Sequence, residues 1–403
     1  MSSRAPTKPG PGVPSVRGMV TKPQSTVRSR ATTGAPSRLV VSRDAIAENT
    51  RRMRALASTP LMAVVKADGF GLGAGVVARA ALAGGASELG VATCDEALAL
   101  RADGIEAPVL AWMLHPGAPL ADAVGADVAL SCASVDQLEA VAAAASSLGV
   151  TAAVELEVET GMHRSGCPVE EWGPLVRAAV AAERCNGVDV RGVWTHFGAT
   201  DDDPTSFADP LLRLDAAWAT ARALGLRPRR RHAASSLATA IAPAARLGLV
   251  RVGAALFGIE PVAARPLGLA PSIRWETSVA QLRDVPAGAS VGYGGGYRTS
   301  RRGRLALLPL GYADGIPRSA WPGSTVVIRG RRHPLVGAVS MDQCVVDVGD
   351  AGVGVGDEVV LIGEASRGEP TLAEWAMLLG TIPQEVLTRI GARVERVSDG
   401  RAA

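Results

Sequence analysis

Two kinds of segment alternate regularly between about residue 39 and residue 260. Short aliphatic or β-branched runs, typical of buried strands, alternate with alanine-rich stretches of helical period. The runs lie at 61–66, 89–93, 108–113, 127–131, 151–159, 192–196, 230–235 and 249–253, and the helical stretches at 44–57, 73–84, 94–102, 135–148, 168–184 and 208–224. Eight strands with intervening helices over about 220 residues favour a (β/α)8 barrel over an open doubly wound sheet. The 230–235 run is the weakest of these strand predictions because RRRH is too polar to be recognised by hydrophobicity.

A different pattern begins after about residue 270, where short strands are separated by turn signals. It predicts a second, mostly β domain with amphipathic helices at 371–380 and 383–390. The expected fold class is therefore α/β: a TIM barrel over 39–268 followed by a C-terminal mostly-β domain over 269–398. Residues 399–403 are expected to form a short tail.

Residues 1–38 are rich in Pro, Ser, Thr, Gly and Arg and show no apolar periodicity. A segment of this composition cannot bury enough apolar surface to order itself, so we expect a disordered tail. Its arginines and serines without acidic residues also resemble an organellar transit peptide, but the apolar spacing for an amphipathic helix is poor. The function of this tail stays open.

The composition argues against several classes of protein. The 403 residues include 42 basic and 39 acidic side chains, and a net charge of +3 gives no sign of a nucleic-acid partner. The five cysteines are scattered without a CxxC pair, which argues against a disulfide framework and a zinc site. The sequence has no run of about 18 apolar residues and no apolar signal segment, so we expect a soluble, cytoplasmic protein with no membrane span.

Two residue types with reactive side chains are scarce. Only Lys8, Lys22 and Lys66 are lysines, and the first two lie in the tail. Any chemistry that needs an amine in the folded part must therefore use Lys66. The tyrosines are equally few, which leaves three candidates for a phenol acid or base: Tyr293, Tyr297 and Tyr312.

Polar residues gather at the predicted carboxyl ends of the barrel strands, where (β/α)8 barrels build their active sites. The set comprises Lys66, Arg164, His196, His232, Ser235, Ser236, Arg251 and Gly253. An amine, two imidazoles, arginines and small hydroxyl or glycine positions at one rim would suit a phosphorylated ligand and an amine nucleophile. Taken singly, each residue is better explained as an ordinary rim residue. The two histidines lack carboxylates at metal-ligand spacing, so no metal site is expected.

Together, these positions and their neighbours resemble a known family. The segment AVVKADGFGLGA around Lys66 resembles AVVKANAYGHGA of bacterial alanine racemases, and LGYADGIPR around Tyr312 resembles their VGYADGYPR. Further matches occur in family order at ETGMHRSG, THFGATD, RHAASS, VRVGAALFG, VGYGGGY and VGAVSMDQCVVDV. The resemblance covers about residues 39–397. It implies a fold-type III pyridoxal-phosphate enzyme, an isomerase that interconverts L- and D-alanine as a head-to-tail homodimer with shared active sites.

The resemblance also implies roles for the matching residues. Lys66 would hold pyridoxal phosphate as a Schiff base and act as base on one face of the substrate, and Tyr312 of the partner subunit would act on the other face. Arg164 and the backbone amide of Met341, the latter from the second subunit, would bind the substrate carboxylate. The implied cofactor-binding residues are Lys66, His196, Ser236, Arg251, Gly253 and Ala254.

A more specific role is implied for Arg251, and supporting roles are expected for His232 and Glu157. Arg251 matches an arginine that hydrogen-bonds the pyridine nitrogen. His232 matches a histidine that is hydrogen-bonded to groups around the catalytic tyrosine. Glu157 stands where many family members have a lysine that becomes carbamylated and pairs with the substrate-binding arginine. A glutamate carries its own negative charge, so Glu157 is expected to orient Arg164 without that modification.

Several positions depart from the family pattern. Phe70 and Ser398 stand about where phosphate-binding tyrosines are expected, which predicts weaker cofactor retention by about 1 kcal/mol or more for each lost hydrogen bond. Leu72, Ala67 and Ser235 also differ from the family. These changes leave two alternatives open: a racemase of a related amino acid such as serine, or a catalytically impaired homologue that binds pyridoxal phosphate. The retained second base favours an enzyme, while its substrate range and pathway stay open.

Overall fold

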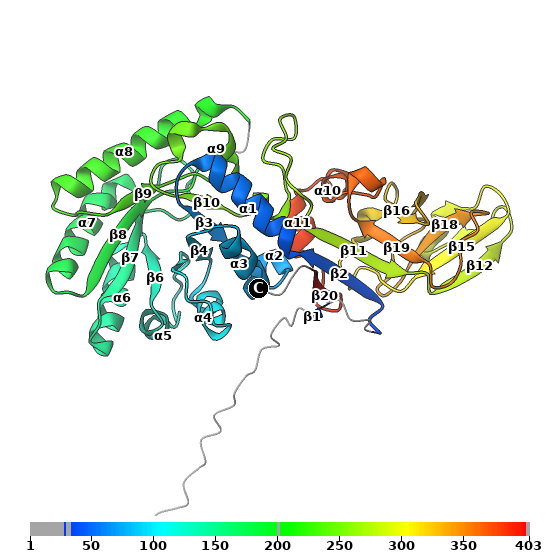
Figure 1. Cartoon of the computed structure of the whole chain (residues 1–403), viewed down its shortest axis with the longest axis horizontal. Helices are drawn as coiled ribbons and strands as arrows, with labels where there is room; N and C mark the ends of the chain where they lie inside the picture. The colour runs from blue at the N-terminus through cyan, green and yellow to red at the C-terminus, as the bar shows by residue number, and fades with distance from the viewer. Residues whose placement is uncertain (1–27, 30–33, 200–201, 400–403) are drawn as a thin grey trace, which may run out of the picture.

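The structure is a computed structural model that describes residues 28–29, 34–199 and 202–399. A barrel of strands and helices lies beside a mostly β part, and the chain passes between them near both ends (Figure 1). Most of the tail predicted for residues 1–38 lies outside the described residues, as do residues 400–403.

Eight short parallel strands form the barrel sheet. They are β3 (Leu61–Val64), β4 (Glu88–Val91), β5 (Val109–Ala111), β6 (Val128–Cys132), β7 (Ala152–Glu157), β8 (Val188–Trp194), β9 (Arg230–His232) and β10 (Val250–Val252). Their order is β10-β3-β4-β5-β6-β7-β8-β9, which confirms the predicted barrel. Between β9 and β10 the Gly248 N–H donates to Arg231 O at 3.1 Å and the Arg251 N–H to Ala234 O at 2.9 Å, so the barrel is nearly closed.

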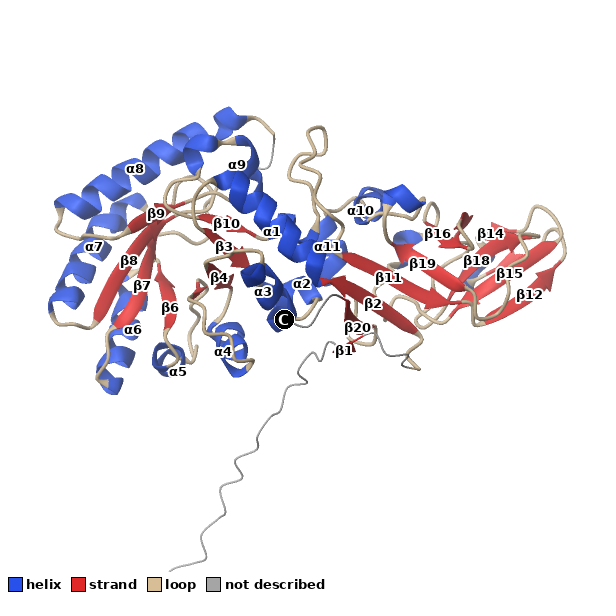
Figure 2. Ribbon diagram, in the orientation of Figure 1, coloured by secondary structure: helices blue, strands red, loops and turns tan. Residues whose placement is uncertain are grey.

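Helices cover the outside of this sheet (Figure 2). They are α1 (Arg43–Ala57), α3 (Ala74–Ala83), α4 (Cys94–Ala102), α5 (Leu120–Gly125), α6 (Val135–Leu148), α7 (Val169–Arg184), α8 (Ala208–Ala223) and α9 (Ser236–Ile241), with 3-10 turns η1 (Pro204–Phe207), η2 (Pro243–Ala245) and η3 (Ala254–Phe257). Side-chain caps set several starts: Thr93 and Glu96 form a capping box at α4, and Ser134 accepts from the Gln137 N–H at α6.

Over the residues that the structure describes, the second part contains three sheets. The largest has the strands β1 (Arg28–Ser29), β20 (Glu395–Asp399), β2 (Ser37–Ser42), β11 (Ile273–Ser278), β19 (Glu358–Ile362), β16 (Thr325–Ile328) and β17 (Arg331–Pro334) in that order. The others are β12 (Gln281–Val285), β15 (Gly303–Leu308) and β18 (Cys344–Gly349), and β13 (Ser290–Val291) with β14 (Tyr297–Arg298). Short helical elements are η4 (Tyr293–Gly295), η5 (Arg318–Ala320), η6 (Ala365–Arg367), α10 (Leu372–Leu379) and α11 (Pro383–Thr388).

The strand β2 joins the N-terminal segment to the second part. It pairs antiparallel with β11 and parallel with β20, so it lies in the large β sheet and not in the barrel. Ser37 is buried there, donates to Glu276 O at 3.1 Å and accepts from Trp275 Nε1 at 2.9 Å. The strand thus starts two residues before the predicted barrel boundary, at Ser37. The boundaries 39–268 and 269–398 themselves stay predictions.

Buried apolar side chains of the barrel and of the β sheets form one large continuous cluster. Among the helices of the described residues, none has the length and apolar character needed to cross a membrane. The same residues include no group of three or more His, Cys, Asp or Glu placed to hold a metal ion.

Candidate active site

A cavity of about 810 Å³ opens at the carboxyl ends of the barrel strands. Its volume lies within the range of about 300–1,000 Å³ that is usual for small-molecule and cofactor sites. The cavity is lined by all the predicted cofactor-binding residues, which are Lys66, His196, Ser236, Arg251, Gly253 and Ala254. Arg164 lines it as well. The wall is completed by α11, which comes from the second part of the molecule and packs against the turn that follows β3.

Lys66 begins that turn, α2 (Lys66–Gly71), immediately beyond β3. Residues 67–70 all have positive φ, between 53° and 62°, so the turn is left-handed. L-amino acids other than glycine pay about 1 kcal/mol or more each for this conformation, which persists only where the surroundings hold it. Glu96 contributes by accepting the Ala67 N–H at 2.7 Å. The backbone next to Lys66 is therefore held in a specific, strained shape.

The Lys66 amine lies in a partly desolvated position within the cavity. Its Nζ is 5.9 Å from the centroid of the Trp112 ring. Burial, and next the positive charge of Arg164, lowers the pKa of Lys66, with Glu96 opposing. A lowered pKa increases the neutral fraction of the amine at physiological pH, and the neutral amine is the form that acts as nucleophile or base.

Arg251, in β10, is buried and well anchored. Its Nη1 donates to His232 Nδ1 at 2.8 Å, and its Nη2 lies within hydrogen-bond distance of Thr195 O (2.8 Å), Ala233 O (3.0 Å) and His196 Nδ1 (3.1 Å). Burial lowers the pKa of Arg251 to about 10, so the guanidinium is still protonated at neutral pH. Because arginine has no acceptor, both contacted imidazole Nδ1 atoms must accept.

His196 is neutral in this environment. Burial, followed by the charges of Arg251, Arg164 and Lys66, lowers its pKa to about 3. Since Nδ1 accepts from Arg251, the single ring proton of His196 is on Nε2. The residue is therefore a neutral N–H donor at the cavity wall across the physiological pH range.

Small residues and a hydroxyl form another part of the wall. Ser236 Oγ accepts the backbone N–H groups of Gly253 at 3.2 Å and Ala255 at 3.4 Å, which leaves its own hydrogen to donate. A Cβ at Gly253 would lie 3.3 Å from both Phe70 Cζ and Val64 Cβ, tighter than usual packing. Gly253 therefore keeps this wall open, and the donors suit an anionic group.

Gln384, in α11, is a cavity residue that the sequence analysis missed. Its Oε1 is buried and has no hydrogen-bond partner among the described residues. A buried polar atom without a protein partner needs a water or a ligand group to satisfy it, and this one lines the cavity. Ser398 lies in β20 opposite Val41 and does not line this cavity. Its match to a phosphate-binding tyrosine of the family stays a prediction.

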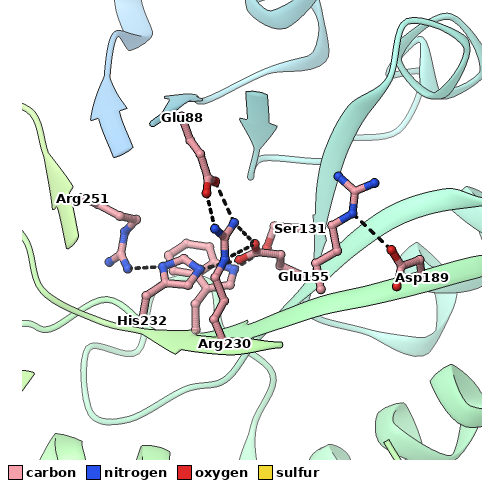
Figure 3. A network of polar contacts seen from close by, with 9 residues as sticks. Glu88, Ser131, Glu155, Asp189, Arg230, His232 and Arg251 are labelled. Atoms are coloured by element: carbon pink, nitrogen blue, oxygen red, sulfur yellow. Dashed lines mark hydrogen bonds and ion pairs between the residues drawn. The ribbon is translucent and has the colours of Figure 1, made fainter. Parts of the chain in front are cut away.

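The two residues expected to support the site lie behind the cavity wall. His232 is buried, and in this chain it contacts Arg251 and Glu155, a carboxylate that the sequence analysis also missed (Figure 3). Glu157 accepts from Ser165 Oγ at 2.8 Å, and burial raises its pKa against the opposing charges of Arg251 and Arg164. Within the described residues no ion pair joins Glu157 to Arg164, so the orientation of Arg164 by Glu157 stays a prediction.

Tyr312 and Met341 lie elsewhere, on adjacent loops of the second part. The Tyr312 N–H donates to Ser340 O and the Ala313 N–H to Met341 O, each at 3.0 Å. Tyr312 is 40% exposed and Met341 53% exposed. Neither residue lines the cavity of its own chain, so the structure brings together Lys66 and the cofactor residues but not Lys66 and Tyr312.

Comparisons with known proteins match both parts of the chain. A family model described as the N-terminal domain of alanine racemase matches residues 41–261, and one described as its C-terminal domain matches residues 272–398. A curated alanine racemase from Salinispora arenicola is 45% identical over 369 residues, which cover 89% of this chain and 97% of the relative.

Solved structures agree with these matches. The alanine racemase of a D-cycloserine-producing Streptomyces lavendulae has a TM-score of 0.89 and 42% identity, and the match covers 92% of this chain and 99% of that one. The alanine racemase of Bartonella henselae, described with covalently bound pyridoxal phosphate, has a TM-score of 0.80 and 28% identity, with coverage of 91% and 100%.

Proposed function

The chain belongs to the alanine racemase family, and from this premise we propose that it interconverts L-alanine and D-alanine with pyridoxal phosphate as cofactor. The observation that carries the proposal is the cavity at the barrel mouth, where the Lys66 amine lies with the guanidinium groups of Arg164 and Arg251. Lys66 is the single lysine beyond residue 38, so it is the amine that would hold the cofactor.

The residues of the cavity fit this cofactor. The Lys66 amine suits the aldehyde, and the Ser236 hydroxyl with the Ala254 backbone N–H suits the phosphate, while the Gly253 N–H holds Ser236 in place. When bound, pyridoxal phosphate supplies a pyridine ring that withdraws electrons from the substrate α-carbon. Arg251 would donate to the pyridine nitrogen. Because Arg251 is itself cationic, it disfavours protonation there and so limits side reactions.

Racemisation needs one group on each face of the α-carbon. Lys66 would remove or return the α-proton at its Nζ on one face, which its lowered pKa favours. Tyr312 of the partner subunit would do so at its phenol oxygen on the other face. Two groups with opposite protonation states permit the reaction in both directions, because each ends a turnover in the state in which the other began.

Binding of the substrate would fall to cationic and backbone donors. Arg164, in the loop after β7, lines the cavity and would pair with the substrate carboxylate. The Met341 backbone amide of the partner subunit would be the second carboxylate donor. His196 would contribute a neutral N–H that adds no positive charge beside the Lys66 amine.

We also propose a homodimer with shared sites. Tyr312 and Met341 lie on neighbouring loops with exposed side chains, outside the cavity of their own chain. A second copy in head-to-tail arrangement would bring these loops to the open cavity and complete it. A cytoplasmic enzyme that supplies D-alanine is proposed as well, supported by five unpaired cysteines, all within the described residues, as suits a reducing compartment.

The test is proton exchange combined with chiral analysis. Purified protein with added pyridoxal phosphate is incubated with L-alanine in deuterated buffer, and the α-proton signal is followed by NMR. We expect loss of the signal together with accumulation of D-alanine, and we expect Lys66→Ala to abolish both. The variant Lys66→Ala is compared with Arg51→Ala, a change at an exposed helix position of α1.

Three other results would contradict parts of the proposal. Exchange without D-alanine would show that only one of the two bases, Lys66 or Tyr312, acts on the substrate. Exchange with L-serine and none with L-alanine would replace the substrate. Absence of exchange with both amino acids, in protein that binds pyridoxal phosphate, would favour a binding protein over an enzyme.

A further inference from the structure

A carboxylate lies inside the barrel, where apolar side chains are usual. Glu155, in the middle of β7, has no exposed surface. An ionised carboxylate there is costly unless it is paired and hydrogen-bonded. Burial acts to raise the pKa of Glu155, but its contacts with His232 and Arg230 outweigh burial and lower it to about 2. The side chain is therefore charged at neutral pH and needs its partners.

Those partners form a chain of contacts inside the barrel (Figure 3). The chain runs from Glu88, at the amino-terminal end of β4, to Arg251 in the cavity wall. Glu88, at the start of β4, pairs with Arg230 at the start of β9, with Oε2 to Nη2 at 2.7 Å. Arg230 donates to Glu155 Oε1 from Nη2 at 2.6 Å and from Nε at 3.1 Å. The second carboxylate oxygen of Glu155 contacts His232 Nε2, and His232 Nδ1 accepts from Arg251.

These contacts define the proton position on His232. Arg251 can only donate, so Nδ1 of His232 must be an unprotonated acceptor. The ring proton is then on Nε2, where it donates to the Glu155 carboxylate. In the other neutral tautomer, the Nδ1–H of His232 would point at the Arg251 guanidinium, and the lone pair of Nε2 would face the Glu155 carboxylate. Glu155 therefore selects the one form of His232 that can hold Arg251.

Stacking holds the ring in place. The Trp194 ring lies parallel to His232, with an angle of 4° and centroids 5.8 Å apart, and the Arg251 guanidinium carbon is 4.7 Å from the Trp194 centroid. Trp194 is in turn fixed by its Nε1–H, which donates to Ser131 Oγ at 2.9 Å. No carboxylate among the described residues pairs directly with Arg251. His232 thus links this buried cation to the Glu155 carboxylate.

We propose that Glu155 is a positioning residue for the cofactor site: through His232 it orients the Arg251 guanidinium toward the cavity. The inference rests on the proposed function for the identity of the ligand that Arg251 meets. A similar arrangement is known at metal sites, where a carboxylate hydrogen-bonded to a metal-binding histidine fixes the tautomer and the orientation of its ring. Glu155 does the same for His232. Glu88 has a different role, because it pairs with Arg230 and does not contact His232.

The decisive variant is Glu155→Gln, with Glu88→Gln as matched control. In E155Q the amide N–H₂ must face either His232 or Arg230, both donors, so one contact is lost. We expect about 10–100-fold weaker binding of pyridoxal phosphate, the range seen for outer partners of metal-bound histidines. The turnover number should fall while the KM for alanine stays nearly unchanged, because Arg251 does not bind the substrate carboxylate. E88Q should lower thermal stability and leave both cofactor affinity and turnover at wild-type values.

A second readout does not depend on the cofactor or on activity. The chain has five histidines, so selective ¹⁵N-histidine labelling resolves the ring state of His232 by NMR. We expect a neutral ring protonated on Nε2 in the wild type and in E88Q, and a mixture of forms in E155Q. If E155Q does not fold, Glu155→Asp, which keeps the charge but shortens the reach to His232, takes its place.

The outcomes separate the inference from the proposed function. Equal cofactor affinity in E155Q and E88Q, or a His232 ring protonated on Nδ1 in the wild type, would overturn the role of Glu155. If the wild type fails to bind pyridoxal phosphate or to racemise alanine, the proposed function fails. The His232 spectrum then still tests the link from Glu155 to His232, because that link exists without the cofactor.

Discussion

Gly192 lies beside Glu155 on the neighbouring strand, and a Cβ at Gly192 would be 3.0 Å from the Glu155 Cδ and its Oε2. Such contacts are tighter than most contacts of real Cβ atoms, so one of the two groups would have to shift. The carboxylate therefore occupies the space that a side chain at this position of β8 would need. A glycine in a strand interior usually marks close approach of another group, and here that group is a buried charge.

Gly192→Ala should displace the Glu155 carboxylate from His232 and Arg230. We expect a loss of about 1–3 kcal/mol in the free energy of unfolding, as for overpacked cores, measured by urea denaturation. Gly125→Ala is the control, because a Cβ there meets only Leu148 Cδ1, at 3.6 Å, and the residue lies in helix α5. Equal stability of both variants would show that the carboxylate can move aside.

Gln384→Leu should have opposite effects on the free and the cofactor-bound protein. The change removes a buried Oε1 that has no partner among the described residues, so stability without cofactor should stay equal or rise. It also removes a cavity-wall group whose free Oε1 would accept a hydrogen bond from the bound cofactor, so cofactor affinity should fall by about tenfold for that lost hydrogen bond. Thermal melts with and without pyridoxal phosphate measure both. A variant stabilised by the cofactor as much as the wild type would exclude this role.

Stability should decline in acid through His196. Its pKa is lowered to about 3 in the folded protein from an ordinary value of 6.5, so the unfolded chain binds the proton first. Stability is therefore complete above pH 6.5 and is lost as the pH falls toward 3, by about 2 kcal/mol between pH 6.5 and about pH 5. His196→Asn should flatten this part of the profile in urea denaturation, whereas His115→Asn, at an exposed position, should not. A wild-type profile without slope between pH 6.5 and 5 would refute the prediction.

Mixed dimers test the shared site. Lys66→Ala and Tyr312→Phe should each abolish or nearly abolish racemisation alone. After the two variants are unfolded together and refolded, each mixed dimer would contain one complete site, with Lys66 from one subunit and Tyr312 from the other. We expect activity to return on mixing, as measured by D-alanine formation. Failure to regain activity, when wild-type protein survives the same treatment, would place both residues in one chain.

Local patterns predicted most of the fold correctly. The eight barrel strands appear as short apolar runs because strands buried on both faces leave few polar positions. The polar strand β9 was the least obvious, and its Arg230 is accommodated by contacts with Glu88 and Glu155 that come from distant strands. The pairing of β2 with β11 and β20 had no local signal, since it joins residues more than 200 positions apart. Such pairing depends on which strand edges of the large β sheet are unpaired once the two parts of the chain have folded.

The site shows the same division. Lys66, Arg164, His196, Ser236 and Arg251 were found because each lies at or near a strand end, and in a parallel barrel these ends meet at one rim. Glu155 was missed because a single glutamate inside a strand looks like a solvent-facing residue. Gln384 was missed because α11 reaches the barrel from the other part of the chain.

The order of apolar and polar residues determined the barrel, its strand ends and the single available amine, because these depend on near neighbours in the chain and on residue chemistry. The state of the site depended on the folded structure. Burial lowers the pKa values of Lys66 and His196, and the proton position on His232 follows from two partners on other strands. Desolvation and hydrogen-bond direction are properties of the space around a group, and that space exists only after distant segments have packed together.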